Sequence, residues 1–462
     1  MNKRQKLLAV GLPMVLAACA TPEPPAPLAT IAPQQWHAPL PHGGNVAGLA
    51  QWWQQQGDPM LAQLIASAQA ASPTIASARA RIDEARALRV ASGAALLPTL
   101  DAGASVARSS AQPPQPMATT AQAGFQSAWE IDLFGAGRAA RDAAQSRLEG
   151  ATAGWHEARV SVAAEVANLY YSQRACDGLL AIALSDAASR GETARLADLS
   201  RQAGFTAPAV AALARASAAE ANARATQQRA QCDAGTKALV ALTALPEPEL
   251  RQKLSTVAAP AAETGIVIDS LPAQVLSQRP DVFAAEREVA AASADIGGAQ
   301  AQRFPRLSLS GSVGRASFRT GGTDVELSTW SIGPLALSLP VFDGGRRAAN
   351  VEAAQARYEA AVATYRARVR QAVREVEEAL VNLNSTAARG EDARIAVEGY
   401  RSSFNATEAR YKSGLASLVE LEEARRNRLA SENALVALER ERRAAWIALY
   451  RAAGGGWTAA MQ

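Results

Sequence analysis

Aromatic residues, histidines and cysteines are all scarce in this chain of 462 residues. Phenylalanine, tryptophan and tyrosine make up 5% of it, whereas hydrophobic residues make up 48%, and alanine supplies much of the difference. Alanine is the best helix former and lets helices approach closely. The composition therefore favours long, closely packed helices over a bulky globular core.

Long apolar runs and strong charge are also absent. After the first 20 residues no run of about 20 apolar residues occurs, so any membrane crossing by the mature chain would have to use β-strands. The net charge is +4, and arginines are interspersed with acidic residues, which is typical of solvated helix faces. No basic stripe indicates a nucleic-acid partner.

The N-terminus is built like a bacterial export signal. Residues 1–18 combine a basic start with a short apolar run from Leu7 to Ala18, too short to span a bilayer. The run ends in Leu-Ala-Ala-Cys19, which resembles a lipobox, where cleavage precedes a cysteine that then carries a covalent lipid. An ordinary signal peptide with a chance cysteine is the alternative. We expect lipidation at Cys19, an extended tether over residues 19–50, and, because Ala20 is compatible with it, an outer-membrane location.

An internal repeat organises the rest of the chain. Residues 73–98 align without a gap on residues 280–305, and the segment 130–138 matches 338–346. Gly204 in LSRQAGF corresponds to Gly414 in RYKSGL. We therefore predict one structural plan in two copies, residues 51–245 and 271–452, with a linker over 246–270 and a C-terminal tail over 453–462.

Each copy contains two segments with the alternation of β-strands. We expect strands at about 99–109, 122–134, 306–318 and 329–341. In the second of these, Phe125, Trp129 and Ile131 alternate with Gln126 and Glu130, so that one face is apolar and the other polar. Half-buried strands of a soluble sheet show the same pattern, but export and lipidation favour a membrane barrel with a wet lumen.

Four strands cannot close a barrel, and open sheet edges are not tolerated in lipid. Several chains must therefore pool their strands, and three copies give twelve. Small outer-membrane barrels need at least about eight strands, and a homotrimer would supply a twelve-stranded transmembrane β-barrel in contact with outer-membrane lipid.

Two long helical hairpins follow the strands, at about 136–244 and 345–452. In the second, apolar residues from Tyr358 to Leu383 recur at alternating spacings of four and three, which indicates a coiled-coil seam. Helices of about 60 residues would be roughly 90–100 Å long. They would turn back at Gly204 and Gly414, as glycines just beyond a helix end do. The fold class is thus mainly α with transmembrane β, and the hairpins of three chains form a periplasmic α-barrel.

Cys176 and Cys232 are the only cysteines besides Cys19. Each lies about 28 residues from Gly204, on opposite sides of it, so an antiparallel hairpin brings them level. The periplasm is oxidising. We expect a Cys176–Cys232 disulfide, with two buried free thiols as the alternative.

Motifs for catalysis are not convincing. The three histidines, His37, His42 and His156, form no metal-binding pattern, and no HExxH, P-loop or GxSxG occurs. GAGRAA at 135–140 matches a dinucleotide fingerprint. However, the second copy keeps the turn and loses that fingerprint, and the preceding strand is amphipathic, unlike a Rossmann strand. We predict no enzymatic activity, no metal and no cofactor other than lipid.

The whole pattern resembles the outer-membrane efflux family, the TolC/NodT-like lipoproteins. The motifs are the lipobox, SQRPDVFAAE, FPRLSLSGS, LPVFDGGRR and RYKSGLASLVELEEARR. The resemblance implies a trimeric passive exit duct of a tripartite efflux system, with a periplasmic adaptor and an inner-membrane pump, often of the resistance-nodulation-division type. A structural coiled-coil lipoprotein without a pore is the alternative; it would leave the amphipathic strands without a role.

The resemblance also implies a closed periplasmic tip just after the Tyr-x-x-Gly turn. An acidic residue followed three places later by a basic one commonly forms the constriction there. Glu423 and Arg426 match those places, and Glu420 lies one turn earlier. Exposed helix charges without a gating role are the alternative. Two residues depart from the pattern, because Glu422 adds an acidic neighbour and Arg425 replaces a usual glutamine.

Overall fold

The computed structural model describes residues 36–38, 52–55, 57–110, 117–255 and 272–457. The predicted signal peptide, Cys19 and His42 lie outside the described residues. The chain divides into two compact units: the described residues of the first fall within 79–153 and 283–367, and those of the second within 30–78, 154–282 and 368–462. Within the described ranges, no helix is long and apolar enough to cross a membrane.

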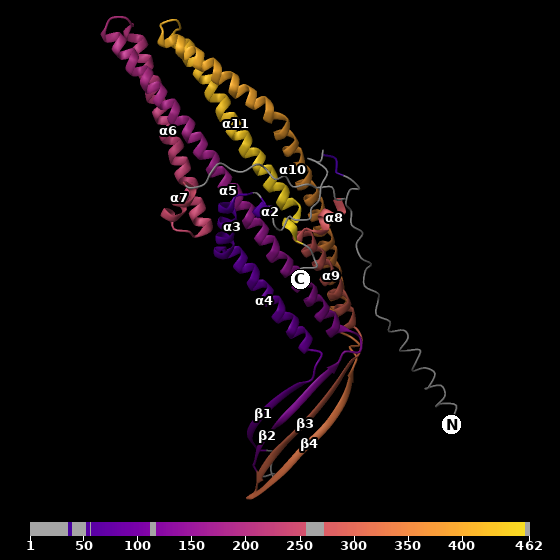
Figure 1. The fold of residues 1–462 in the computed structure, drawn as a ribbon. Helices are drawn as coiled ribbons and strands as arrows, with labels where there is room; N and C mark the ends of the chain where they lie inside the picture. Colours follow the sequence, from indigo (N-terminus) through magenta and orange to yellow (C-terminus); the bar gives the residue numbers. More distant parts are fainter. Residues whose placement is uncertain (1–35, 39–51, 56, 111–116, 256–271, 458–462) are drawn as a thin grey trace. The chain divides into compact units, whose positions relative to one another are not determined.

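The first unit contains one antiparallel sheet in the order β1-β2-β3-β4 (Figure 1). The strands are β1 (Thr99–Ser109), β2 (Ala118–Ile131), β3 (Arg306–Thr320) and β4 (Thr323–Ser338). Residues directly opposite each other on neighbouring strands point to the same face. Phe125 lies opposite Val313, which lies opposite Trp330, and we call the face that these three share the outer face. The other face, which carries Gln126, Ser312 and Ser331, is the inner face.

The predicted boundaries of three strands need correction. β2 was expected at 122–134 but begins at Ala118, because Ala118 is paired on both sides, and it ends before Asp132, which caps the following helix. β4 was expected at 329–341 but begins at Thr323, directly after Gly321 and Gly322, which both have positive φ and make a two-residue hairpin turn. Two charges near its start, at 324 and 326, hid this part of the strand in the sequence. β3 continues two residues beyond the predicted 318, and β4 ends at Ser338, three residues before the predicted 341.

The long helices begin immediately after the sheet. α5 (Ala136–Gln202) and α10 (Arg346–Lys412) have 67 residues each. An aspartate carboxylate caps the start of each one: Asp132 accepts from the backbone N–H groups of Gly137 and Arg138, and Asp343 from those of Gly345 and Arg347. The helices that precede the strands, α4 (Pro73–Ala94) and α9 (Pro280–Ala301), have 22 residues each. The same elements thus recur in both halves of the chain.

The second unit contains the outer parts of both hairpins. α6 (Pro208–Thr243) returns beside α5, and α11 (Leu418–Ala452) beside α10. The seam predicted in α10 is buried from Tyr365 to Leu383, with the intervening seam positions at most 2% exposed. Short helices complete the unit: α2 (Trp52–Gln55), α3 (Pro59–Ala71), α7 (Glu247–Ser255) and α8 (Pro272–Ser277).

Three segments predicted as connections contain ordered structure. The linker at 246–270 starts with α7, whose Leu250 is fully buried in the apolar core, and residues 256–270 lie outside the described residues. The tail at 453–462 starts with a short 3₁₀ turn and a buried Trp457. Part of the predicted tether is docked, because His37 and Ala38 donate backbone hydrogen bonds of 2.7 Å to Glu377. Packing against the helices, which composition does not report, explains all three corrections.

Candidate functional site

Both hairpins turn at the glycines that the sequence singles out. Gly204 and Gly414 have φ values of +81° and +74°. At each turn the following residue donates its N–H to a carbonyl five residues back, Phe205 to Ser200 and Leu415 to Arg410. This is the hydrogen-bond pattern with which helices commonly end at a left-handed glycine. The side chains of Phe205 and Leu415 stay largely exposed beside the turns.

The three predicted gate residues follow the second turn on α11. Glu420 is engaged locally: its carboxylate accepts from the Ser417 N–H at 2.7 Å and from the Ser417 hydroxyl at 2.9 Å. These hydrogen bonds lower the pKa of Glu420 and complete a capping box at the start of α11. Glu423 and Arg426 are exposed, and within the described parts of the chain neither makes an ion pair or hydrogen bond. The structure therefore does not bring Glu423 and Arg426 together within one chain.

A buried ionic cluster lies beside these residues and joins the two hairpins. It contains Asp186 and Arg190 of α5 and Glu422 and Arg425 of α11. Arg190 donates from Nε to both carboxylate oxygens of Asp186, at 3.0 and 2.9 Å, and from Nη1 to Glu422. Arg425 donates from Nη1 to the other oxygen of Glu422 at 2.6 Å. Glu422 thus bridges two arginines, and Asp186 also accepts from Arg224 of α6 at 3.5 Å.

Hydroxyl groups also contact the Arg425 guanidinium. Arg425 donates from Nη2 to Ser189 Oγ at 2.9 Å and to Thr193 Oγ1 at 3.2 Å. The Arg425 side chain is fully buried. Burial lowers the pKa of its guanidinium, Glu422 opposes the shift, and Arg190 adds to it. The cluster therefore connects α5 to α11 by buried ion pairs. Its residues contribute to stability jointly, because removing one buried charge leaves its partner unpaired.

Sequence reasoning missed this cluster, although a signal was present. Arg425 continues the apolar spacing of the buried Leu418 and Leu421, and Arg190 continues the spacing of the buried Ala194 and Ala197. Charged residues at core positions of two different helices indicate a buried ion pair. The Glu422 and Arg425 departures from the family pattern also belong together, since the two side chains are bonded to each other.

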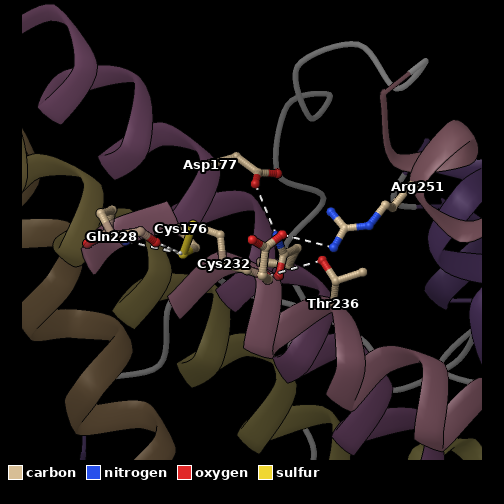
Figure 2. Close-up of a disulfide and its surroundings, with 8 residues drawn as sticks. Cys176, Asp177, Gln228, Cys232, Thr236 and Arg251 are labelled. Carbon is tan, nitrogen blue, oxygen red and sulfur yellow. Dashed lines mark hydrogen bonds and ion pairs between the residues drawn. A yellow bond between two sulfur atoms is a disulfide. The ribbon is translucent and has the colours of Figure 1, made fainter. Parts of the chain in front are cut away.

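Cys176 of α5 and Cys232 of α6 form a disulfide, with 5.5 Å between their Cα atoms (Figure 2). Cys232 is buried, and Gln228, one turn earlier on α6, donates its side-chain amide to the Cys176 sulfur at 3.1 Å. The bond fixes the first hairpin well away from its turn. The second hairpin has no cysteine.

Removing the disulfide should destabilise the first hairpin. The bond closes a loop with a sequence separation of 56 residues. By the chain-entropy relation, the double variant Cys176→Ser with Cys232→Ser should therefore have a free energy of unfolding about 4 kcal/mol lower than that of the unmodified protein. Calorimetry of the purified protein with and without a reductant measures this loss. The reductant should lower the unfolding temperature of the unmodified protein and leave the double variant unchanged. An equal effect of the reductant on both proteins would contradict the assignment.

The GAGRAA motif has a structural use. The backbone N–H of Gly137, which a bound phosphate would need in a dinucleotide site, is bonded to Asp132 at 3.1 Å. The N–H and the side chain of Arg138 also bond to that carboxylate. The helix start is thus already neutralised by an acid of the chain itself. Among the described residues, no group of three or more metal-ligating side chains is placed to hold a metal ion.

Comparison with known proteins decides the family. The profile of the outer membrane efflux proteins matches residues 64–245 and 271–455, which is most of the chain. The chain belongs to the outer membrane efflux protein family. Outer membrane protein OprJ of Pseudomonas aeruginosa is 34% identical over 342 residues, which cover 71% of this chain and 68% of that protein. The pyoverdine export outer membrane protein OpmQ of Pseudomonas putida is 28% identical over 471 residues and covers 99% of both chains.

Solved structures agree with this assignment. The outer-membrane channel OprN is 28% identical, has a TM-score of 0.83, and the match covers 95% of this chain and 99% of that one. The Campylobacter jejuni CmeC channel, at 22% identity and a TM-score of 0.84 over 95% of each chain, shows the same fold. The predicted fold class is confirmed. Each chain contains long helical hairpins and contributes four strands to a trimeric twelve-stranded barrel. This outer membrane efflux protein is an outer-membrane channel, not a pore-free lipoprotein.

Proposed function

We propose that this outer membrane efflux protein works as a homotrimeric, passive exit duct that receives its cargo from a periplasmic adaptor and an inner-membrane pump of the resistance-nodulation-division type. The observation that carries this proposal is the combination of an amphipathic four-stranded sheet with two long hairpins in every chain. The names of two relatives, a solvent efflux pump protein and a toluene efflux pump protein of Pseudomonas putida, support an efflux partner. Co-purification with an inner-membrane pump after cross-linking tests this assembly.

Covalent lipid on Cys19 is part of the same proposal. Its support is the sequence Leu-Ala-Ala-Cys after a short apolar run. Acyl chains on the mature N-terminus would anchor the tether in the bilayer, and more than one chain is needed for stable anchoring. The mass of the N-terminal peptide measures the lipid directly. A peptide that begins before Cys19, or an unmodified Cys19, would exclude it.

A constriction at the hairpin turns is the proposed gate. Glu423 and Arg426 lie three residues apart on α11 and leave their charges exposed and without a partner among the described residues of the chain. In a trimer, such side chains are placed to pair with those of a neighbouring chain. A ring of three glutamates in a narrow pore attracts cations, and arginines beside it hold the ring closed. Glu420 contributes less freely, because Ser417 already engages its carboxylate.

Removing the proposed gate charges should open the duct. We expect the double variant Glu423→Ala with Arg426→Ala to conduct ions severalfold better in single-channel recordings, because the charge pairs that hold the tip closed are lost. Glu439→Ala with Arg440→Ala is a matched control, since it removes two exposed charges of the same helix farther from the turn. It should leave conductance unchanged. Equal conductance of the gate variant and the unmodified protein would contradict the gate.

A further inference from the structure

The chemistry of the two sheet faces reverses along β3 and β4. In the half of the sheet nearer the helices, the outer face is apolar, with Phe125, Trp129 and Val313, and the inner face carries Ser312 and other polar residues. Toward the β3–β4 turn the outer-face positions are charged or polar: Arg315, Ser317, Arg319, Asp324 and Glu326. The residue pairs run unbroken from Val313 with Trp330 to Thr320 with Thr323, so the reversal is one of residue type and not of register.

The inner face becomes apolar where the outer face becomes polar. Phe318 lies directly opposite Val325, and Ala316 lies directly opposite Leu327. We call these four residues the apolar arc. Ala316 is buried at 7% exposure, whereas Phe318, Val325 and Leu327 remain 38%, 44% and 48% exposed. The apolar arc is therefore a patch of cross-strand contacts that still presents much of its surface to the space inside the sheet.

A row of glycines separates the polar part of the inner face from the apolar arc. Gly103, Gly124 and Gly314 share one register across β1, β2 and β3. A Cβ on Gly124 would lie 2.5 Å from the Val313 carbonyl oxygen, and one on Gly314 would lie 2.7 Å from the Ala123 carbonyl oxygen. Glycines in strands mark close backbone approach or a bend at a barrel corner. The inner face thus carries no side chain at these three glycines, and beyond Gly314 it becomes apolar on β3 and its neighbour β4.

The charges on the outer face show where the β3–β4 end of the sheet lies relative to the bilayer. An arginine on the lipid face of a barrel is destabilising by about 2–4 kcal/mol at the middle of the bilayer and by little near its surface. Arg315 and Arg319, with Asp324 bonded to Arg319, therefore fit water or lipid headgroups rather than hydrocarbon. Because the helices lie at the opposite end of the strands, the β3–β4 turn is at the exit of the duct. Lipid cannot cover the apolar arc there, so the arc faces the lumen.

We propose that the apolar arcs of three chains form a collar inside the outer mouth of the barrel, which passes apolar and amphiphilic small molecules more readily than hydrated ions. The proposal rests on the channel function. The collar is interrupted, because β1 and β2 contribute Ser105, Ala107, Thr120 and Gln122 at the same level. Apolar constrictions hinder ions because water leaves them easily and ions must then lose hydration. Apolar cargo has no such hydration shell to lose when it passes the collar.

Thiol labelling from outside the cell tests the collar. A single reporter, Ser331→Cys, lies on the inner face on the helix side of the glycine row, and Thr323→Cys, at the β3–β4 turn, measures unhindered access. The disulfide keeps Cys176 and Cys232 unreactive. Whole cells are treated either with an uncharged maleimide or with a sulfonated maleimide dye too large for general porins. Cells without a reporter give the background labelling.

The collar predicts discrimination between the two reagents. For each reagent, the labelling rate of the Ser331→Cys reporter is divided by that of Thr323→Cys. We expect this normalised rate to be about tenfold lower for the sulfonated dye than for the uncharged reagent. Adding Phe318→Ser, Val325→Thr and Leu327→Thr should reduce this ratio between the two reagents to about one. The matched control, Ala107→Ser with Thr120→Ser and Gln122→Ser, changes the other arc at the same level and should preserve the ratio.

Two results would overturn the proposal: an equal ratio in the apolar-arc variant and the unmodified protein, or no discrimination in the unmodified protein. Export of a dye by the same cells is measured in parallel. If the cells fail to export the dye but the reporter still distinguishes the two maleimides, the result would count against the channel function rather than the collar. If export is normal and the reporter does not distinguish the two maleimides, the result would count against the collar alone.

Discussion

Arg425→Met should lower the free energy of unfolding by about 3 kcal/mol, because it removes one of the two arginines that pair with the partly buried Glu422. Thermal unfolding followed by the helical circular dichroism signal measures the change. The matched control is Arg440→Met, which removes an exposed arginine of the same helix. It should have no measurable effect.

Removing both partners should restore most of the loss. The double variant Glu422→Leu with Arg425→Gln removes one charge of each sign and leaves Asp186 paired with Arg190. Replacing a complete buried pair is often neutral, whereas breaking one is not. If the double variant is as unstable as Arg425→Met alone, the four charges are not coupled in the way that the structure shows.

Leu309→Arg should prevent assembly in the outer membrane. Leu309 lies on the outer face opposite Trp129 and Leu335, six residues along β3 from Arg315, and an arginine at mid-bilayer depth is destabilising by about 2–4 kcal/mol in each of three chains. The yield of trimer in the outer-membrane fraction should therefore fall to a small fraction of normal. Immunoblotting of unheated samples measures it.

Ser308→Arg provides the control for that experiment. Ser308 is the preceding residue of the same strand but lies on the inner face, opposite Glu130 and Ala336. The same side chain would then point into a wet lumen, and assembly should continue. Equal loss of trimer in both variants would mean that the two faces are not distinguished by lipid and water.

The repetitive features of the fold were predictable from sequence because they depend on periodicity. The seam of α10 and the turns at Gly204 and Gly414 follow from spacing and from the freedom of glycine at positive φ. The lipid-facing half of the sheet follows from the alternation around Phe125. The gate prediction at Glu423 and Arg426 depends on a neighbouring chain, so a single chain leaves both residues exposed.

The features that were missed depend on which elements meet. The start of β4 was hidden because its outer face is charged at Asp324 and Glu326, which reads as a loop when the outer face is assumed to be apolar throughout. α7 was hidden in a Pro- and Ala-rich stretch because only packing of Leu250 into the core defines it. The ionic cluster needs α5 and α11 side by side, and no periodicity within either helix reveals its partner.

Three chains pool their strands into one closed barrel, and the mass of the complex extracted from outer membranes in mild detergent tests this assembly most directly. Each chain supplies one four-stranded sheet with β1 and β4 at its edges, and open edges are not tolerated in lipid. We expect the mass of three chains. A stable monomer that retains its β-structure in the membrane would contradict the account.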